Sequence, residues 1–131
     1  MKQKRLDLYH VHLKYVRDLS KVDDHVMSIS PQINKNNRPF LGLIVVCNGR
    51  TYCIPLSSPK KKHVHMKNDI DFIKILDGEK IIGILNINNM IPVNQYVITP
   101  VELKINEFDS SDMIRYKTMI IKELTWCRKK T

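Results

Sequence analysis

Two turn-forming residue pairs constrain the fold of this 131-residue chain more than any other feature. Asn48-Gly49 and Asp77-Gly78 favour the tight turn of a β-hairpin, whose central residues take positive φ. Each pair lies between two runs of strand-forming residues, so the sequence predicts two antiparallel hairpins. The predicted strands of these hairpins are Phe40–Cys47, Arg50–Leu56, Ile70–Leu76 and Lys80–Ile87.

Further strands and two helices are predicted on either side of the hairpins. Leu6–Val11 and Gln95–Thr99 have strand patterns, and Asp109–Asp112 has the composition of an amino-terminal helix cap. Apolar residues before and after the hairpins recur at intervals of three and four, which is the spacing of one helix face. They are Val11, Tyr15, Leu19, Val22 and Val26 in the first segment, and Met113, Tyr116, Ile120, Leu124 and Cys127 in the last.

This order of elements predicts an α+β fold in one domain, residues 1–131. We expect a compact, strongly twisted antiparallel β-sheet or small barrel flanked by helices. No window has the roughly 18 uncharged apolar residues of a membrane span, and the amino terminus lacks a secretory pattern, so we expect a cytoplasmic protein without a membrane partner. The three cysteines contain no Cys-x-x-Cys pair, which argues against a disulfide framework and a structural zinc site. Cys47 and Cys53 are instead predicted to be small buried side chains.

The positive charge of the chain is concentrated in residues 30–67. This window contains seven basic residues and no Asp or Glu, whereas the net charge of the whole chain is +9. Basic and acidic residues are nearly balanced on both sides of the window. A surplus of this kind is typical of a surface that binds a polyanion, most often a nucleic acid. A second, smaller basic cluster, residues 128–130, is a candidate for contacts with further RNA.

Ser57–Lys67 places two hydroxyls, four ammonium groups and two imidazoles directly after a predicted strand. Cleaving RNA without a metal requires one group to take the proton of the 2′ hydroxyl, another to protonate the leaving 5′ oxygen, and positive charge beside the phosphorus. These side chains can supply all three roles. The acid-free window offers no carboxylate cluster for a metal, so neither a metal nor another cofactor is predicted.

Each of these residues also has a simpler interpretation. A run of lysines is often a solvated loop, and Ser57 and Ser58 could be turn residues that introduce Pro59. His63 could transfer protons or merely contact phosphate. Tyr15 fits a core tyrosine with its hydroxyl at the rim of the core. From spacing alone, a non-catalytic basic RNA-binding module therefore remains as the alternative to an enzyme.

Several segments together resemble the ToxN/AbiQ family, the endoribonuclease toxins of type III toxin–antitoxin systems. They follow the order of the family over nearly the whole chain, and the Pro-Leu-Ser-Ser-Pro-Lys block ahead of a histidine is fairly specific. The matching segments are Leu13–Leu19 with Tyr15, Val22–Asp24, Arg38–Val45, Asn48-Gly49, Tyr52, Pro55–Lys60, His63, Gly83, Asn86, Met90–Pro92 and Tyr116-Lys117.

The resemblance implies a twisted antiparallel sheet related to the Kid/MazF toxins and metal-independent cleavage of RNA to a 2′,3′-cyclic phosphate. It also implies inhibition by an antitoxin RNA of repeated pseudoknots, cellular mRNA as substrate, a role in phage resistance, and a closed assembly of alternating protein and RNA. By the same resemblance, Ser57 and Ser58 are the hydroxyl pair of the active site, Lys60 its essential lysine, and Tyr15 a tyrosine that lines it. Ser57 stands where threonine is frequent in the family, which keeps the hydroxyl. The candidate RNA-binding residues are Lys35, Arg38, Lys61, Lys62, His63, His65, Lys67 and Asn89.

Overall fold

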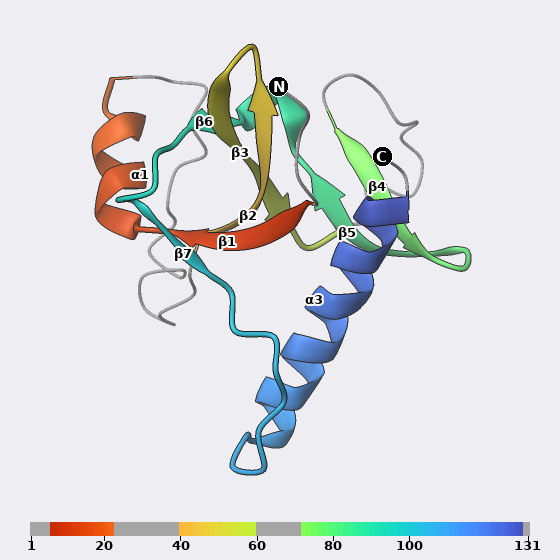
Figure 1. Cartoon of the computed structure of the whole chain (residues 1–131). Helices are drawn as coiled ribbons and strands as arrows, with labels where there is room; N and C mark the ends of the chain where they lie inside the picture. Colours follow the sequence, from red (N-terminus) through yellow and green to blue (C-terminus); the bar gives the residue numbers. More distant parts are fainter. Residues whose placement is uncertain (1–5, 23–39, 60–71, 130–131) are drawn as a thin grey trace.

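A computed structural model describes residues 6–22, 40–59 and 72–129 of the protein (Figure 1). Within these residues, seven strands of one antiparallel sheet form the centre, with helix α1 beside one end and the longer helix α3 crossing the sheet. The strands are β1 (Asp7–Val11), β2 (Phe40–Cys47), β3 (Arg50–Ser57), β4 (Ile73–Asp77), β5 (Lys80–Leu85), β6 (Ile91–Pro92) and β7 (Ile98–Pro100). The helices are α1 (Leu13–Ser20), the short 3-10 helix η2 (Ile87–Asn89) and α3 (Ser111–Lys129).

The sheet is antiparallel throughout and its strand order is β4-β5-β3-β2-β1-β7, with β6 paired to β3 off this path. This confirms the predicted α+β class. Within the described residues the sheet is not closed, because β4 and β7 lie at its two ends and do not pair, so the barrel form of the expectation is wrong.

Both predicted hairpins are present, and their turns differ in one detail. Asn48 and Gly49 have φ angles of 52° and 77°, as the predicted turn requires. In the second hairpin Asp77 pairs with Lys80, so the two central residues of the turn are Gly78 and Glu79. Of these two, only Gly78 has a positive φ. The glycine supplies the conformation that the turn needs, one position earlier in the turn than predicted.

Element ends are where the sequence prediction fails most. Helix α1 ends at Ser20 and leaves Val22 exposed, whereas the apolar spacing predicted a longer helix. Strand β7 begins only at Ile98, because the Asn94 side chain accepts a hydrogen bond from the Tyr96 N–H and holds the preceding residues in a turn. Strand β6 was not predicted. Cys47, predicted to be buried, is exposed beside the first hairpin turn.

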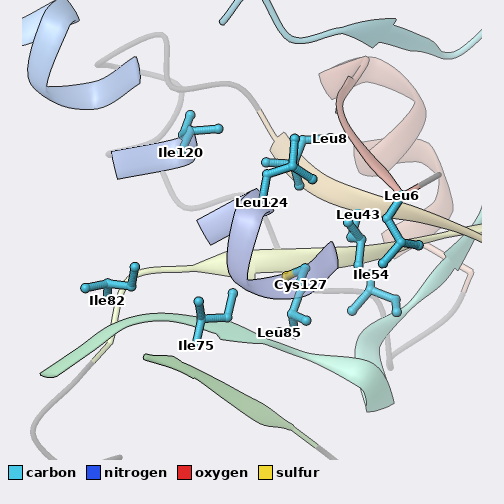
Figure 2. Packing of buried hydrophobic residues seen from close by; sticks show 10 residues of the cluster. All are labelled: Leu6, Leu8, Leu43, Ile54, Ile75, Ile82, Leu85, Ile120, Leu124 and Cys127. Atoms are coloured by element: carbon cyan, nitrogen blue, oxygen red, sulfur yellow. The ribbon is translucent and has the colours of Figure 1, made fainter. Parts of the chain in front are cut away.

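Two apolar clusters lie on opposite faces of the sheet, because neighbouring residues of one strand point to opposite faces. Leu43 and Ile54 belong to the larger cluster beneath α3 (Figure 2), whereas Cys53, the neighbour of Ile54, belongs to the cluster beneath α1. The larger cluster consists of Leu6, Leu8, Leu43, Ile54, Ile75, Ile82, Leu85, Ile120, Leu124 and Cys127. The smaller consists of Val11, Val16, Cys53 and Ile91.

Helix α3 packs on the sheet with its carboxyl-terminal half only. The Ser110 hydroxyl accepts a hydrogen bond from the Met113 N–H at 3.1 Å, which confirms the predicted cap. Met113 and Tyr116 were predicted to share the buried stripe but are about two-fifths exposed, because the first turns of α3 extend beyond the sheet (Figure 1). No helix in the described ranges is long and apolar enough to span a bilayer.

Candidate functional site

The first serine of the candidate pair, Ser57, is the last residue of β3 and is half-buried. Its backbone pairs with Ile84 of β5, which fixes this end of β3 within the sheet. Because side chains alternate along a strand, Ser57 lies on the same face as Cys53, the face that α1 covers farther along β3. The hydroxyl thus belongs to a rigid strand end.

The Asn86 side chain bonds this hydroxyl, although no role in the site was predicted for Asn86. The Asn86 side-chain Nδ2 donates to Ser57 Oγ at 3.0 Å and to the Pro55 carbonyl at 3.3 Å. The backbone N–H of Asn86 donates to the same carbonyl at 2.9 Å. Asn86 follows the last residue of β5 and precedes the 3-10 turn η2, whereas the predicted strand Lys80–Ile87 ran through Asn86 and gave no sign of this role.

Ser58 and Pro59 follow the strand and are both exposed. A residue before proline favours extended conformations, which fits the position of Ser58 directly after β3. The remaining candidates of the basic segment lie outside the described residues. These are Lys35, Arg38, Lys60, Lys61, Lys62, His63, His65 and Lys67.

Lys74, which was not predicted as a site residue, lies in the same row of the sheet as Ser57. Ile84 pairs with Ser57 on one side and with Lys74 of β4 on the other. Directly paired residues share a face of the sheet, so Lys74 lies on the face of Ser57 at two strand spacings, about 10 Å between backbones. Lys74 therefore adds positive charge near the hydroxyl from outside the acid-free window.

The structure gives Tyr15 a core contact as well as a polar one. Its ring packs against the cluster of Val11, Val16, Cys53 and Ile91. Its hydroxyl donates to the Pro92 carbonyl at 2.5 Å, and Pro92 pairs with Tyr52, near the end of β3 opposite to Ser57. Among the described contacts, none joins Tyr15 to Ser57, although both lie on one face of the sheet.

Two other candidates occupy well-defined positions. Asn89 is half-buried and is the last residue of η2, the 3-10 turn that follows Asn86. Arg128, from the second basic cluster, serves the fold, since its Nε donates to the Leu6 carbonyl at 2.9 Å and its guanidinium lies 3.7 Å from the Asp7 carboxylate. No cluster of three or more His, Cys, Asp or Glu side chains suited to a metal occurs among residues 6–22, 40–59 and 72–129.

The protein is a small basic α+β protein with an open antiparallel sheet. One strand of this sheet ends at the hydroxyl of Ser57, and the run Lys60–Lys62 follows in the sequence. Residues 7–131 match the model of the toxin ToxN family of type III toxin–antitoxin systems. The chain therefore belongs to this family, as the motif resemblance predicted. It is 28% identical to the endoribonuclease ToxN of Pectobacterium atrosepticum over 129 residues, which cover 94% of this chain and 71% of that protein.

Solved structures share the fold. One comes from a bacterial type III toxin–antitoxin system in which a non-coding RNA pseudoknot selectively inhibits the toxin. It has a TM-score of 0.76 and 21% identity, over 97% of this chain and 71% of that one. AbiQ, a lactococcal anti-phage endoribonuclease of the same type of system, has a TM-score of 0.73 and 23% identity, over 96% of this chain and 73% of its own.

Proposed function

We propose that this protein is the toxin of a type III toxin–antitoxin system, and that it cleaves RNA without a metal to leave a 2′,3′-cyclic phosphate. The observation that carries the proposal is the Ser57 hydroxyl, held by Asn86 at the end of β3 and followed within three residues by Lys60, in a chain of the ToxN family. The proposed place of action is the cytoplasm, where cellular RNA is the substrate.

The candidate residues take separate roles in this reaction. Ser57 and Ser58 hold the scissile phosphate, and Lys60 stabilises the negative charge that develops on the phosphorane or on the leaving 5′ oxygen. Tyr15 is assigned to the site by the family resemblance alone, since its hydroxyl bonds the Pro92 carbonyl near the opposite end of β3. The 2′ hydroxyl of the substrate loses its proton to a general base and its oxygen bonds to phosphorus, while the bond to the 5′ oxygen breaks and that oxygen gains a proton from a general acid. The carboxylate-free window 30–67 supports a mechanism that relies on ammonium groups and hydroxyls.

The experiment that tests the function is incubation of purified protein with a single-stranded transcript in EDTA, followed by analysis of the product ends. We expect cleavage with a cyclic phosphate at the 3′ end of the upstream product. Loss of activity in EDTA and its return with a divalent metal would contradict the mechanism. Binding of the transcript without cleavage would favour a non-catalytic RNA-binding module.

Alanine variants of the two serines separate chemistry from a role in the turn. If the hydroxyls hold the phosphate, Ser57→Ala and Ser58→Ala lower the cleavage rate by about a hundredfold or more, while the melting temperature changes far less than in a core deletion. Ser58 is exposed, so its removal creates no cavity in the described structure. A large fall in melting temperature with a proportionate fall in rate would instead assign both serines to the turn.

The antitoxin is proposed to be a structured RNA, a repeated pseudoknot, that covers the acid-free segment and thereby blocks the site. Its affinity is expected to fall steeply with salt, because each phosphate contact releases counterions, and the double variant Lys61→Ala/Lys62→Ala reduces that slope by about two. Fluorescence titrations of the protein with the RNA, at several salt concentrations between about 50 and 200 mM, measure the slope. An unchanged slope would place these lysines outside the interface.

Light scattering of the complex tests the proposed closed assembly, which a strict one-to-one complex would exclude.

A further inference from the structure

The direction of the hydrogen bond between Asn86 and Ser57 follows from the partners of the Asn86 amide. A backbone carbonyl can only accept hydrogen bonds, so the side-chain atom that faces the Pro55 carbonyl must be the nitrogen Nδ2. The same nitrogen lies 3.0 Å from Ser57 Oγ and has its second hydrogen for that contact. Ser57 Oγ is therefore the acceptor.

This direction decides what the serine hydroxyl can do. A hydroxyl oxygen has two lone pairs and one hydrogen, and the contact with Asn86 occupies a lone pair. The Ser57 hydrogen therefore points away from Asn86 and is a donor to another group. A phosphate oxygen is an acceptor only, so a serine in this state is matched to a phosphodiester.

Resting on the function proposed above, we propose that Asn86 is a positioning residue that fixes the Ser57 hydroxyl as a donor to the scissile phosphate of RNA. Without Asn86, the hydroxyl rotates among its staggered positions and donates to the phosphate for only part of the time. The Asn86 side chain is held in one orientation, because its Nδ2 and the backbone N–H of Asn86 both donate to the Pro55 carbonyl.

The backbone contact also limits the structural damage of a substitution. In Asn86→Ala the Pro55 carbonyl keeps its 2.9 Å hydrogen bond from the backbone N–H of residue 86, so it is not left unpaired. We therefore expect the variant to fold, with a melting temperature close to that of the native protein. The matched control is Asn88→Ala, which changes an exposed asparagine of the neighbouring 3-10 turn η2.

The test is a double-mutant cycle with single-turnover cleavage of one end-labelled transcript that the native protein cuts. Asn86→Ala is expected to lower the rate by about ten- to a hundredfold, whereas Asn88→Ala leaves it unchanged. In the Ser57→Ala background the same Asn86 substitution is expected to have no further effect, because its target is gone. An equal rate loss in both backgrounds, or an Asn86→Ala variant as active as the native protein, would overturn the proposal.

Asn86→Asp provides a second measurement in case Ser57→Ala leaves too little activity for the cycle. A carboxylate can only accept, so it turns the serine hydrogen toward itself and away from the phosphate. We expect Asn86→Asp to be slower than Asn86→Ala at pH 7. The cleavage rate of Asn86→Asp, divided by that of Asn86→Ala, is expected to rise as pH falls, because the carboxylate then gains a proton. Native-like activity of Asn86→Asp at pH 7 would refute the role. A native protein that binds the transcript without cutting it would refute the proposed function itself.

Discussion

Replacing Lys60 with alanine is expected to lower RNA cleavage by about a hundred- to a thousandfold, the effect of losing one group that stabilises charge in the transition state. Lys60 follows Ser57 by three residues, so their Cα atoms are at most about 11 Å apart whatever the path of the chain. A lysine side chain can therefore reach the phosphate that the Ser57 hydroxyl binds. Single-turnover cleavage and growth of cells that express the variant measure the loss.

Lys61→Ala is the matched control, because it removes the same charge one residue farther along the chain. If Lys60 acts on the reacting phosphate, Lys61→Ala changes the rate by only a few fold and weakens binding instead. Circular dichroism and melting temperature are expected to be unchanged in both variants. Equal loss of activity in the two variants would reduce Lys60 to one part of a general phosphate-binding surface.

Glu123→Gln is expected to stabilise the protein at pH 8 by about 2–3 kcal/mol relative to its effect at pH 5. Glu123 of α3 is 7% exposed, and a Cβ placed on Gly83 of β5 would lie 3.0 Å from its Oε2. Burial raises the pKa of Glu123 to about 7 from an ordinary value of 4.5. Burial also raises the pKa of Cys127, to about 11, and the charge of Glu123 adds to this effect.

The sign of the pH dependence follows from which state holds the proton. Between pH 4.5 and about 7 the unfolded chain has lost the Glu123 proton while the folded protein keeps it. The free energy of unfolding therefore falls as pH rises through this window. Glutamine has nearly the same shape and no proton to lose, so the variant lacks this loss. Urea unfolding at several pH values between 5 and 8 measures the difference.

Glu79→Gln is the control for the stability prediction, because Glu79 is exposed in the turn between β4 and β5. We expect this exposed substitution to change the free energy of unfolding by only about 0.5 kcal/mol or less. A Glu123→Gln variant whose effect is independent of pH would show that the Glu123 carboxyl titrates alike in the folded and unfolded chains.

The sequence by itself determined the local features of this protein. The pairs Asn48-Gly49 and Asp77-Gly78 required two hairpins, and the bounds of β2 were predicted without error. The stretch Asp109–Asp112 was recognisable as a helix cap, because the Ser110 hydroxyl bonds a backbone N–H only three residues away. Such features depend on residues that are neighbours in the chain, so a short window of sequence contains all their partners.

The tertiary structure alone decided which distant residues meet. Asn86 reaches Ser57 across 29 positions, because β5 pairs beside the end of β3 and then stops. Lys74 enters the row of Ser57 through the register of two strand pairings, and Glu123 lies over Gly83 because α3 packs on the sheet. Register and helix packing follow from burying one face of every element at once, which no window of local sequence contains.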